Sequence, residues 1–168
     1  MERFDRIDKV QLRNLLNKGW MTHDGMWFFH CFRECGIEKT NKINTAAVKT
    51  MAGIEAKRIK KALGLGDIRS FDDVKILLEE GFNIIKGEFM NFILRFPSEN
   101  VFQWEIPGCF AYDAIKKLGV IDQYQCGIMY RPMAWFDSLG VRYTVNPSSD
   151  KCLMHLEGRC VREFRFSF

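Results

Sequence analysis

Two histidines and two glutamates are the residues of this sequence best suited to chemistry. His23, His30 and Glu34 are spaced so that a helix places them on one stripe, together with Trp27. Glu55 interrupts the apolar stripe that we expect on the next helix along the chain, over residues 44–63. A carboxylate aimed into a protein core must be paired, hydrogen-bonded or protonated, because burying it alone is costly. If the two helices pack together, Glu55 faces the histidines.

That arrangement suits two kinds of chemistry. General acid–base catalysis uses groups whose pKa values are tuned toward neutrality by burial and by their neighbours. Histidine and carboxylate side chains are also metal ligands, and such a site leaves coordination positions open. The alternative is a structural network in which Glu55 accepts hydrogen bonds from His23, His30 or Arg58.

The C-terminal half contains four cysteines that come from four different predicted elements. They are Cys109, Cys126, Cys152 and Cys160, with His155 between the last two. Four converging thiolates would form a closed structural site for zinc or iron. Alternatively they are small core side chains, since free cysteine is among the most buried residue types. A third interpretation is a single activated thiol at Cys126, given a basic neighbour that lowers its pKa.

Residues 1–86 are expected to form helices. Gly19 and Gly36 are expected to end the first and second helices, and Thr22 and Asn44 are expected to cap the second and third. The second is apolar nearly all round, which predicts a buried, central helix. The four predicted helices cover residues 6–17, 23–35, 44–63 and 71–82.

Residues 87–168 have a mixed character, with β-rich runs joined by turn residues. Pro132 is expected to end or kink the helix that contains it. The fold class we predict is α+β, with four N-terminal helices packed on a C-terminal α+β portion with an antiparallel sheet, in one compact domain. The expected elements are a hairpin over 87–106, helices over 109–119 and 123–140, and strands over 142–145, 151–158 and 160–168.

Composition and charge exclude several classes of protein. The 168 residues are 47% hydrophobic, which rules out a disordered chain, and no apolar run is long enough to cross a membrane. The N-terminal residues lack a secretory signal, so we expect a cytoplasmic protein. The net charge of +4 lies in residues 1–86. Lys57, Lys60 and Lys61 there form either a surface for an acidic partner or an ordinary solvated helix face, and we do not expect nucleic acid as a partner.

Two stretches resemble known families. WMTHDGMWFFHCFRECGIEKTNKIN followed by AGIEAKR resembles an uncharacterised prokaryotic cytosolic-protein family. The tail from YQCGIMYRPMAWFDSLG to KCLMHLEGRCVREFRF resembles the L-2-amino-thiazoline-4-carboxylic acid hydrolase-like family, with Gly158, Cys160 and Phe164 matching its C-terminal pattern and Cys126 as the upstream cysteine. More distantly, the tail is similar to the 4-vinyl reductase domain family of small-molecule or metal-sensing modules, which have C-terminal cysteines.

The hydrolase-like resemblance implies an enzyme that cleaves a small cyclic or amide C–N bond in a pocket between the helices and the sheet. His23 or His30 would be the general base, Glu55 would orient it or hold a metal, and Cys126 would line the pocket. The alternative is a non-catalytic sensor that holds a metal or small ligand through the cysteines. The expected partners are a small-molecule ligand and a second copy in a homodimer, with no membrane. The ligand-binding residues we predict are Trp27, Arg58 and Tyr130.

Overall fold

The first half of the chain is dominated by one very long helix. The computed structural model describes residues 3–168, which begin with a short 3-10 helix, η1 (Arg3–Arg6), followed by α1 (Lys9–Ala62). Asp8 caps α1, because its carboxylate accepts hydrogen bonds from the backbone N–H groups of Val10 and Gln11. The Gln11 side chain accepts one from the Asp8 N–H in return, which completes a capping box.

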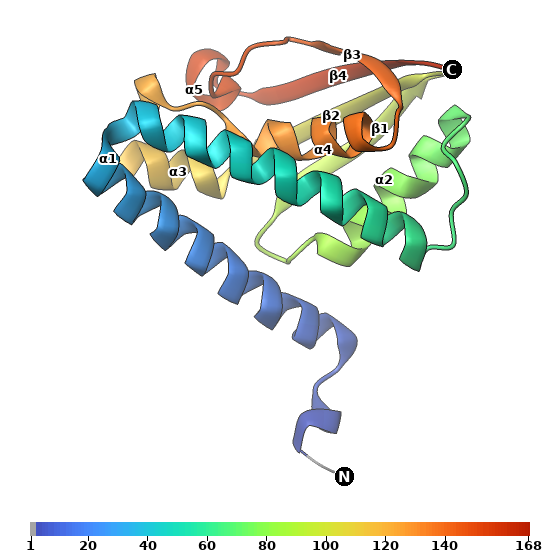
Figure 1. Cartoon of the computed structure of the whole chain (residues 1–168), viewed down its shortest axis with the longest axis horizontal. Helices are drawn as coiled ribbons and strands as arrows, with labels where there is room; N and C mark the ends of the chain where they lie inside the picture. Colours follow the sequence, from blue (N-terminus) through green and yellow to red (C-terminus); the bar gives the residue numbers. More distant parts are fainter. Residues whose placement is uncertain (1–2) are drawn as a thin grey trace.

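A single glycine divides α1 into two arms. Gly36 has φ 75° and ψ 169°, a backbone conformation that essentially only glycine adopts. The first arm (residues 9–35) and the second arm (residues 37–62) therefore run in different directions, and the first arm leads away from the rest of the molecule (Figure 1). Gly36 ends a helix as predicted, but Gly19 does not, and Thr22 and Asn44 lie inside the helix rather than at caps.

The second arm packs against two other helices. These are α2 (Phe71–Ile85), which Ser70 and Asp73 cap with a second capping box, and α4 (Gly127–Ser138). Ala52 and Ala56 are fully buried at this junction, beside Trp135 of α4. Pro132 lies inside α4 without ending it, which corrects the expected break.

An antiparallel sheet of four strands forms the other layer, with α1, α2 and α4 on one side of it (Figure 1). The strand order is β1-β2-β4-β3, so the C-terminal strand lies between the hairpin and β3. Alternate residues of β2 and β4, such as Phe102 and Phe164, are buried against the helices. The strands are β1 (Asn91–Ser98), β2 (Val101–Gly108), β3 (Arg142–Asn146) and β4 (Cys160–Ser167).

Three short helices connect the strands. These are α3 (Phe110–Lys117), the 3-10 helix η2 (Ile121–Gln123) and α5 (Leu153–Glu157). The predicted strand over 151–158 is wrong, because Leu153–Glu157 form α5, which is followed by Gly158 with φ 70°. The predicted hairpin and the last strand are confirmed, and so is the α+β class. In the described part of the chain, no helix carries an apolar stretch of the length that a bilayer crossing needs.

Candidate functional site

An apolar cavity of about 280 Å³ lies where the two arms of α1 diverge. Both arms contribute walls, and the remainder comes from α2, α3, α4 and the ends of β1 and β2. The elbow at Gly36 makes this possible, since it allows a single helix to line the cavity from two directions. Seven of the lining side chains are aromatic: Trp20, Phe28, Phe82, Phe92, Trp104, Phe110 and Tyr124.

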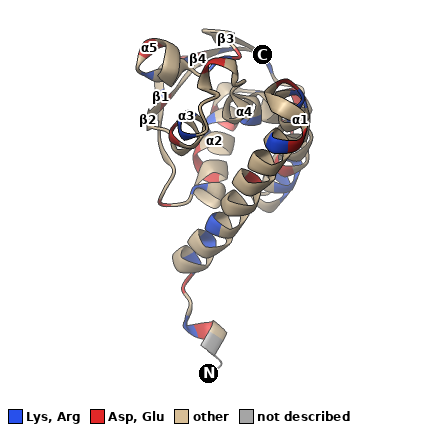
Figure 2. Cartoon of the chain, turned by 90° about the vertical axis from the view of Figure 1, so that its left-hand side faces the viewer, with Lys and Arg blue, Asp and Glu red and all other residues tan. Residues whose placement is uncertain are grey.

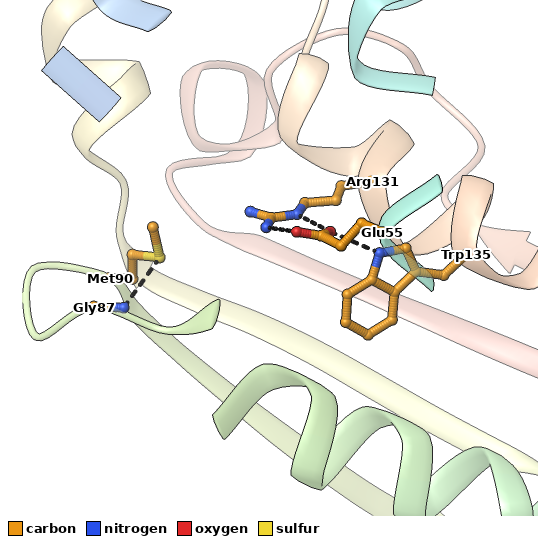
Figure 3. Close-up of polar contacts among 5 residues, drawn as sticks. All are labelled: Glu55, Gly87, Met90, Arg131 and Trp135. Atoms are coloured by element: carbon orange, nitrogen blue, oxygen red, sulfur yellow. Dashed lines mark hydrogen bonds and ion pairs between the residues drawn. The ribbon is translucent and has the colours of Figure 1, made fainter. Parts of the chain in front are cut away.

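Arg131, which lines the cavity, is held in a hydrogen-bonded ion pair. The Arg131 guanidinium donates from Nε to Glu55 Oε2 at 2.8 Å and from Nη2 to Glu55 Oε1 at 2.5 Å. The indole Nε1 of Trp135 donates to Glu55 Oε2 at 2.9 Å (Figure 3). Arg131 also lies over the ring of Trp20, with 4.8 Å between its Cζ and the ring centroid. Glu55 is therefore paired, as its place in an apolar stripe requires, but its partners come from α4.

Asp24 is the other charged residue that lines the cavity. Partial burial beside the cavity raises the pKa of its carboxyl, although the charges of His23 and Arg131 act in the opposite direction. Asp24 is an exposed residue that also lines the cavity, which places it where the cavity meets solvent. Within the described residues, Asp24 makes no ion pair and accepts no side-chain hydrogen bond.

The polar surroundings of the cavity include one unsatisfied donor. Trp104 is 4% exposed, and within the described residues its Nε1–H has no hydrogen-bond partner. Met90 also lines the cavity, and its sulfur accepts a hydrogen bond from the Gly87 N–H (Figure 3). A buried donor without a partner costs free energy.

The four C-terminal cysteines come together on the helix side of the sheet. Cys109, Cys126 and Cys152 occupy the N-cap positions of α3, α4 and α5, and Cys160 begins β4. All four are buried, and the negative charge of one ionised thiol raises the pKa of the neighbouring thiols. Burial raises the pKa of Cys126 to about 12 and that of Cys160 to about 11. Within residues 3–168, however, no three His, Cys, Asp or Glu side chains are arranged to hold a metal ion.

The predicted histidine stripe is exposed and does not bond to Glu55 in the described structure. His23, His30 and Glu34 are exposed on the first arm of α1, and in the described structure none of them makes a hydrogen bond or ion pair with Glu55. The expectation of a buried central helix over residues 23–35 is wrong, because Phe28 is the only buried residue there. The physical reason is that the first arm covers the body with one face only.

The predicted ligand-binding residues lie outside the cavity. Trp27 and Arg58 are exposed, and neither lines the cavity wall. Tyr130 is half-buried, and the Lys49 ammonium lies 4.4 Å from its ring centroid.

Lysines follow both arms of α1, and three of them surround a second hollow. Figure 2 shows basic residues recurring along this helix. Lys57, Lys60 and Lys61 line the hollow together with Leu65 and Ser138. Lys60 also pairs with Asp67 at 3.6 Å, so part of this charge is already neutralised.

Sequence reasoning did not find Asp24, Trp20 or Arg131 as site residues. A signal for Arg131 was available, because a carboxylate in an apolar stripe needs a cationic partner. Arg131 lies four residues before Trp135, so the two side chains point the same way from a helix. Both then reach Glu55.

A family model described as a family of unknown function (DUF6125) matches residues 3–128, which are 126 of the 168 residues. The chain belongs to this family. No curated protein and no solved structure gave a match. The family match includes every lining residue of the cavity except Arg131, and it stops before Cys152 and Cys160. The family carries no assigned activity, so the hydrolase-like and 4-vinyl reductase resemblances stay predictions.

Proposed function

We propose that this protein binds a small molecule in the aromatic cavity. The observation that carries the proposal is the cavity itself: about 280 Å³, walled by seven aromatic side chains, with Asp24 and Arg131 as its only charged lining residues in the described chain. Small-molecule sites are typically concave and mostly apolar, with a few polar groups that orient the ligand. Arg131 is held in place by Glu55 and Trp20, so the cavity wall is organised before any ligand enters.

Hydrolysis of a C–N bond, predicted from the resemblance, has less support from the geometry. The Cys126 thiol is buried with its pKa raised to about 12, and no hydrogen bond joins it to a histidine among the described residues. A nucleophilic thiol needs a lowered pKa and a nearby base. We therefore propose ligand binding rather than catalysis as the function of the cavity.

The test is the binding of a neutral aromatic probe, 2-(1-naphthyl)ethanol, followed by its fluorescence and by native mass spectrometry. Gly25 lines the cavity, and nothing lies within 4 Å of a Cβ placed there. The variant Gly25→Trp should fill the opening and reduce probe affinity at least tenfold, while the wild type binds one molecule.

The matched control is Gly19→Trp. Gly19 belongs to the same arm of α1, also has nothing within 4 Å of an added Cβ, and does not line the cavity. It should bind the probe as the wild type does. If the two variants bind the probe equally well, or if the wild type does not bind it, the proposed site is wrong.

A further inference from the structure

The charges around the cavity do not cancel. Arg131 is positive, but its Nε and Nη2 donors are both committed to Glu55, whose negative charge matches it. Asp24 has no such partner within the described chain. The cavity wall with its ion pair therefore carries one uncompensated negative charge when Asp24 is ionised.

The aromatic walls favour the same sign of ligand. The faces of Trp, Tyr and Phe rings attract cations through their quadrupoles, with an energy of about 0.5–2 kcal/mol for each well-placed ring. One ring already does this, since Arg131 lies over Trp20 with its Cζ 4.8 Å from the centroid. Trp20 and Asp24 are four residues apart on α1, so they lie on neighbouring positions of one helix face at the cavity.

We propose that the ligand of this cavity is an organic cation, with an ammonium group bound by the Asp24 carboxylate and an aromatic or aliphatic body held among the aromatic rings. This inference rests on the proposed function and adds the chemical class of the ligand. Asp24 lies where the cavity meets solvent, so the ammonium stays near the mouth while the body fills the apolar interior.

An anionic ligand fits the cavity less well. The carboxylate of Asp24 would repel it, and Glu55 already takes two donors of the cationic residue on the wall. Burial raises the pKa of Asp24, with His23 and Arg131 as the charges that oppose the shift. Asp24 has no ion-pair partner among the described residues, so its carboxylate is free to pair with a bound cation.

The experiment compares three probes of nearly the same shape and different charge: 2-(1-naphthyl)ethylammonium, 2-(1-naphthyl)ethanol and 1-naphthylacetate. Affinities are measured by fluorescence titration at pH 7 and at low ionic strength. The wild type should bind the ammonium at least tenfold more tightly than the alcohol, and the alcohol more tightly than the carboxylate. Asp24→Asn should remove the preference for the ammonium, so that the variant binds the ammonium no more tightly than the alcohol.

The control for a general charge effect is Glu34→Gln. It changes the net charge by the same amount, on the same arm of α1, at an exposed position away from the cavity. This variant should keep the preference of the wild type. Urea unfolding of each variant checks that it is folded before its affinities are compared.

The outcomes separate the two proposals. If the alcohol binds and Gly25→Trp blocks it, but the ammonium has no advantage or Asp24→Asn leaves that advantage in place, the cavity binds small molecules and the cation assignment is wrong. If the carboxylate binds best, the assignment is also overturned. If none of the probes binds the wild type, the proposed function fails and the cation assignment fails with it.

Discussion

Glu55 shows how a single side chain connects the core of this protein to its cavity. Its side chain is only 16% exposed, and its two oxygens accept three hydrogen bonds, from Arg131 and Trp135. Trp135 is fully buried, so Glu55 fixes a core residue and a cavity residue at once. A partly buried carboxylate of this kind is costly to desolvate, and its partners offset that cost.

Removing the charge of Glu55 should therefore destabilise the fold. We expect Glu55→Gln to lower the free energy of unfolding by roughly 2–3 kcal/mol, because Arg131 is left mostly buried without its counter-ion. Urea denaturation measures this change. Glu105→Gln is the matched control: the Arg95–Glu105 pair is more exposed, at 46% and 31%, and its loss should cost about 0–1 kcal/mol. Equal losses in the two variants would contradict a structural role for Glu55.

Removing the charge of Asp24 should stabilise the fold, in contrast to removing the charge of Glu55. Its pKa in the folded protein is raised above 3.8, so the folded state holds a proton more tightly than the unfolded state does. Its stabilising contribution is complete below pH 3.8 and is lost as the pH rises through the folded pKa. Asp24→Asn should thus become more stable relative to the wild type over that pH range, with a constant difference above it. A wild type that gains stability over the variant as the pH rises would show that the shift has the opposite sign.

The thiols should fall into two classes in the native protein. Cys35 is exposed and Cys31 half-buried, whereas Cys109, Cys126 and Cys152 are buried along with Cys160. Reaction with a disulfide reagent requires an accessible thiolate, and burial both blocks access and raises the pKa of Cys126 to about 12. At pH 8 at most two thiols should react quickly, and all six after unfolding in urea. Rapid loss of the Cys126 thiol, located by peptide mapping, would instead support the predicted nucleophile.

At the scale of elements, Gly36 decides the shape of α1. A residue with a side chain is strained at φ 75° and ψ 169° even where space is available. The space around Gly36 is open, so the backbone conformation alone sets the cost. We expect Gly36→Ala to cost about 1–3 kcal/mol in urea denaturation. Gly19→Ala is the control, since it also meets open space but has ordinary helical geometry, and it should stabilise the protein by about 0.5–1 kcal/mol. If both variants changed the free energy of unfolding in the same direction, the glycine conformation at Gly36 would not be what sets the elbow.

The sequence predicts elements here better than it predicts their ends and their exposure. Period-two patterning and the turn residues predicted the hairpin and the last strand correctly, because strand pleating alone sets which residues share a face. The prediction that a helix ends at Gly19 is wrong, because one glycine costs a long helix only about 1 kcal/mol. The apolar residues over 23–35 predict a buried helix, yet Met26 and Trp27 are exposed. Local periodicity does not say whether a partner covers a face.

The site was harder to predict than the fold because its residues come from distant parts of the chain. The sequence correctly indicates that the Glu55 carboxylate needs a partner, but it predicts His23, His30 or Arg58 rather than Arg131. Arg131 is 76 residues away, and only the packing of α4 on the second arm brings it close. The cavity depends in turn on the backbone angle at Gly36, which the spacing of side chains does not encode.

At the scale of the whole molecule, the cavity lies at the junction between the first arm and the body. Few side-chain hydrogen bonds join the first arm to α2 and to the loop between α2 and β1. Arg13 donates to the Asn83 carbonyl, and Asn14 accepts from the Glu88 N–H. Most of the remaining attachment is apolar, as in the edge-to-face contact of Phe28 with Tyr124. A ligand in the cavity would add contacts to Trp20 and other lining residues of the arm, and so would hold the arm against the body.

Ligand binding should therefore protect the first arm more than any other helix surface. With the naphthylethylammonium probe at about 100 times its Kd, binding stabilises the bound state by about 2.7 kcal/mol, which limits the slowing of amide exchange to roughly 100-fold. Hydrogen exchange should slow most in residues 9–35 and at the start of α4, and little in β3, which does not line the cavity. Gly25→Trp should show no change when the probe is added. Protection confined to residues 37–62 would mean that the arm does not close on the ligand, and the first arm would then be only a static wall of the site.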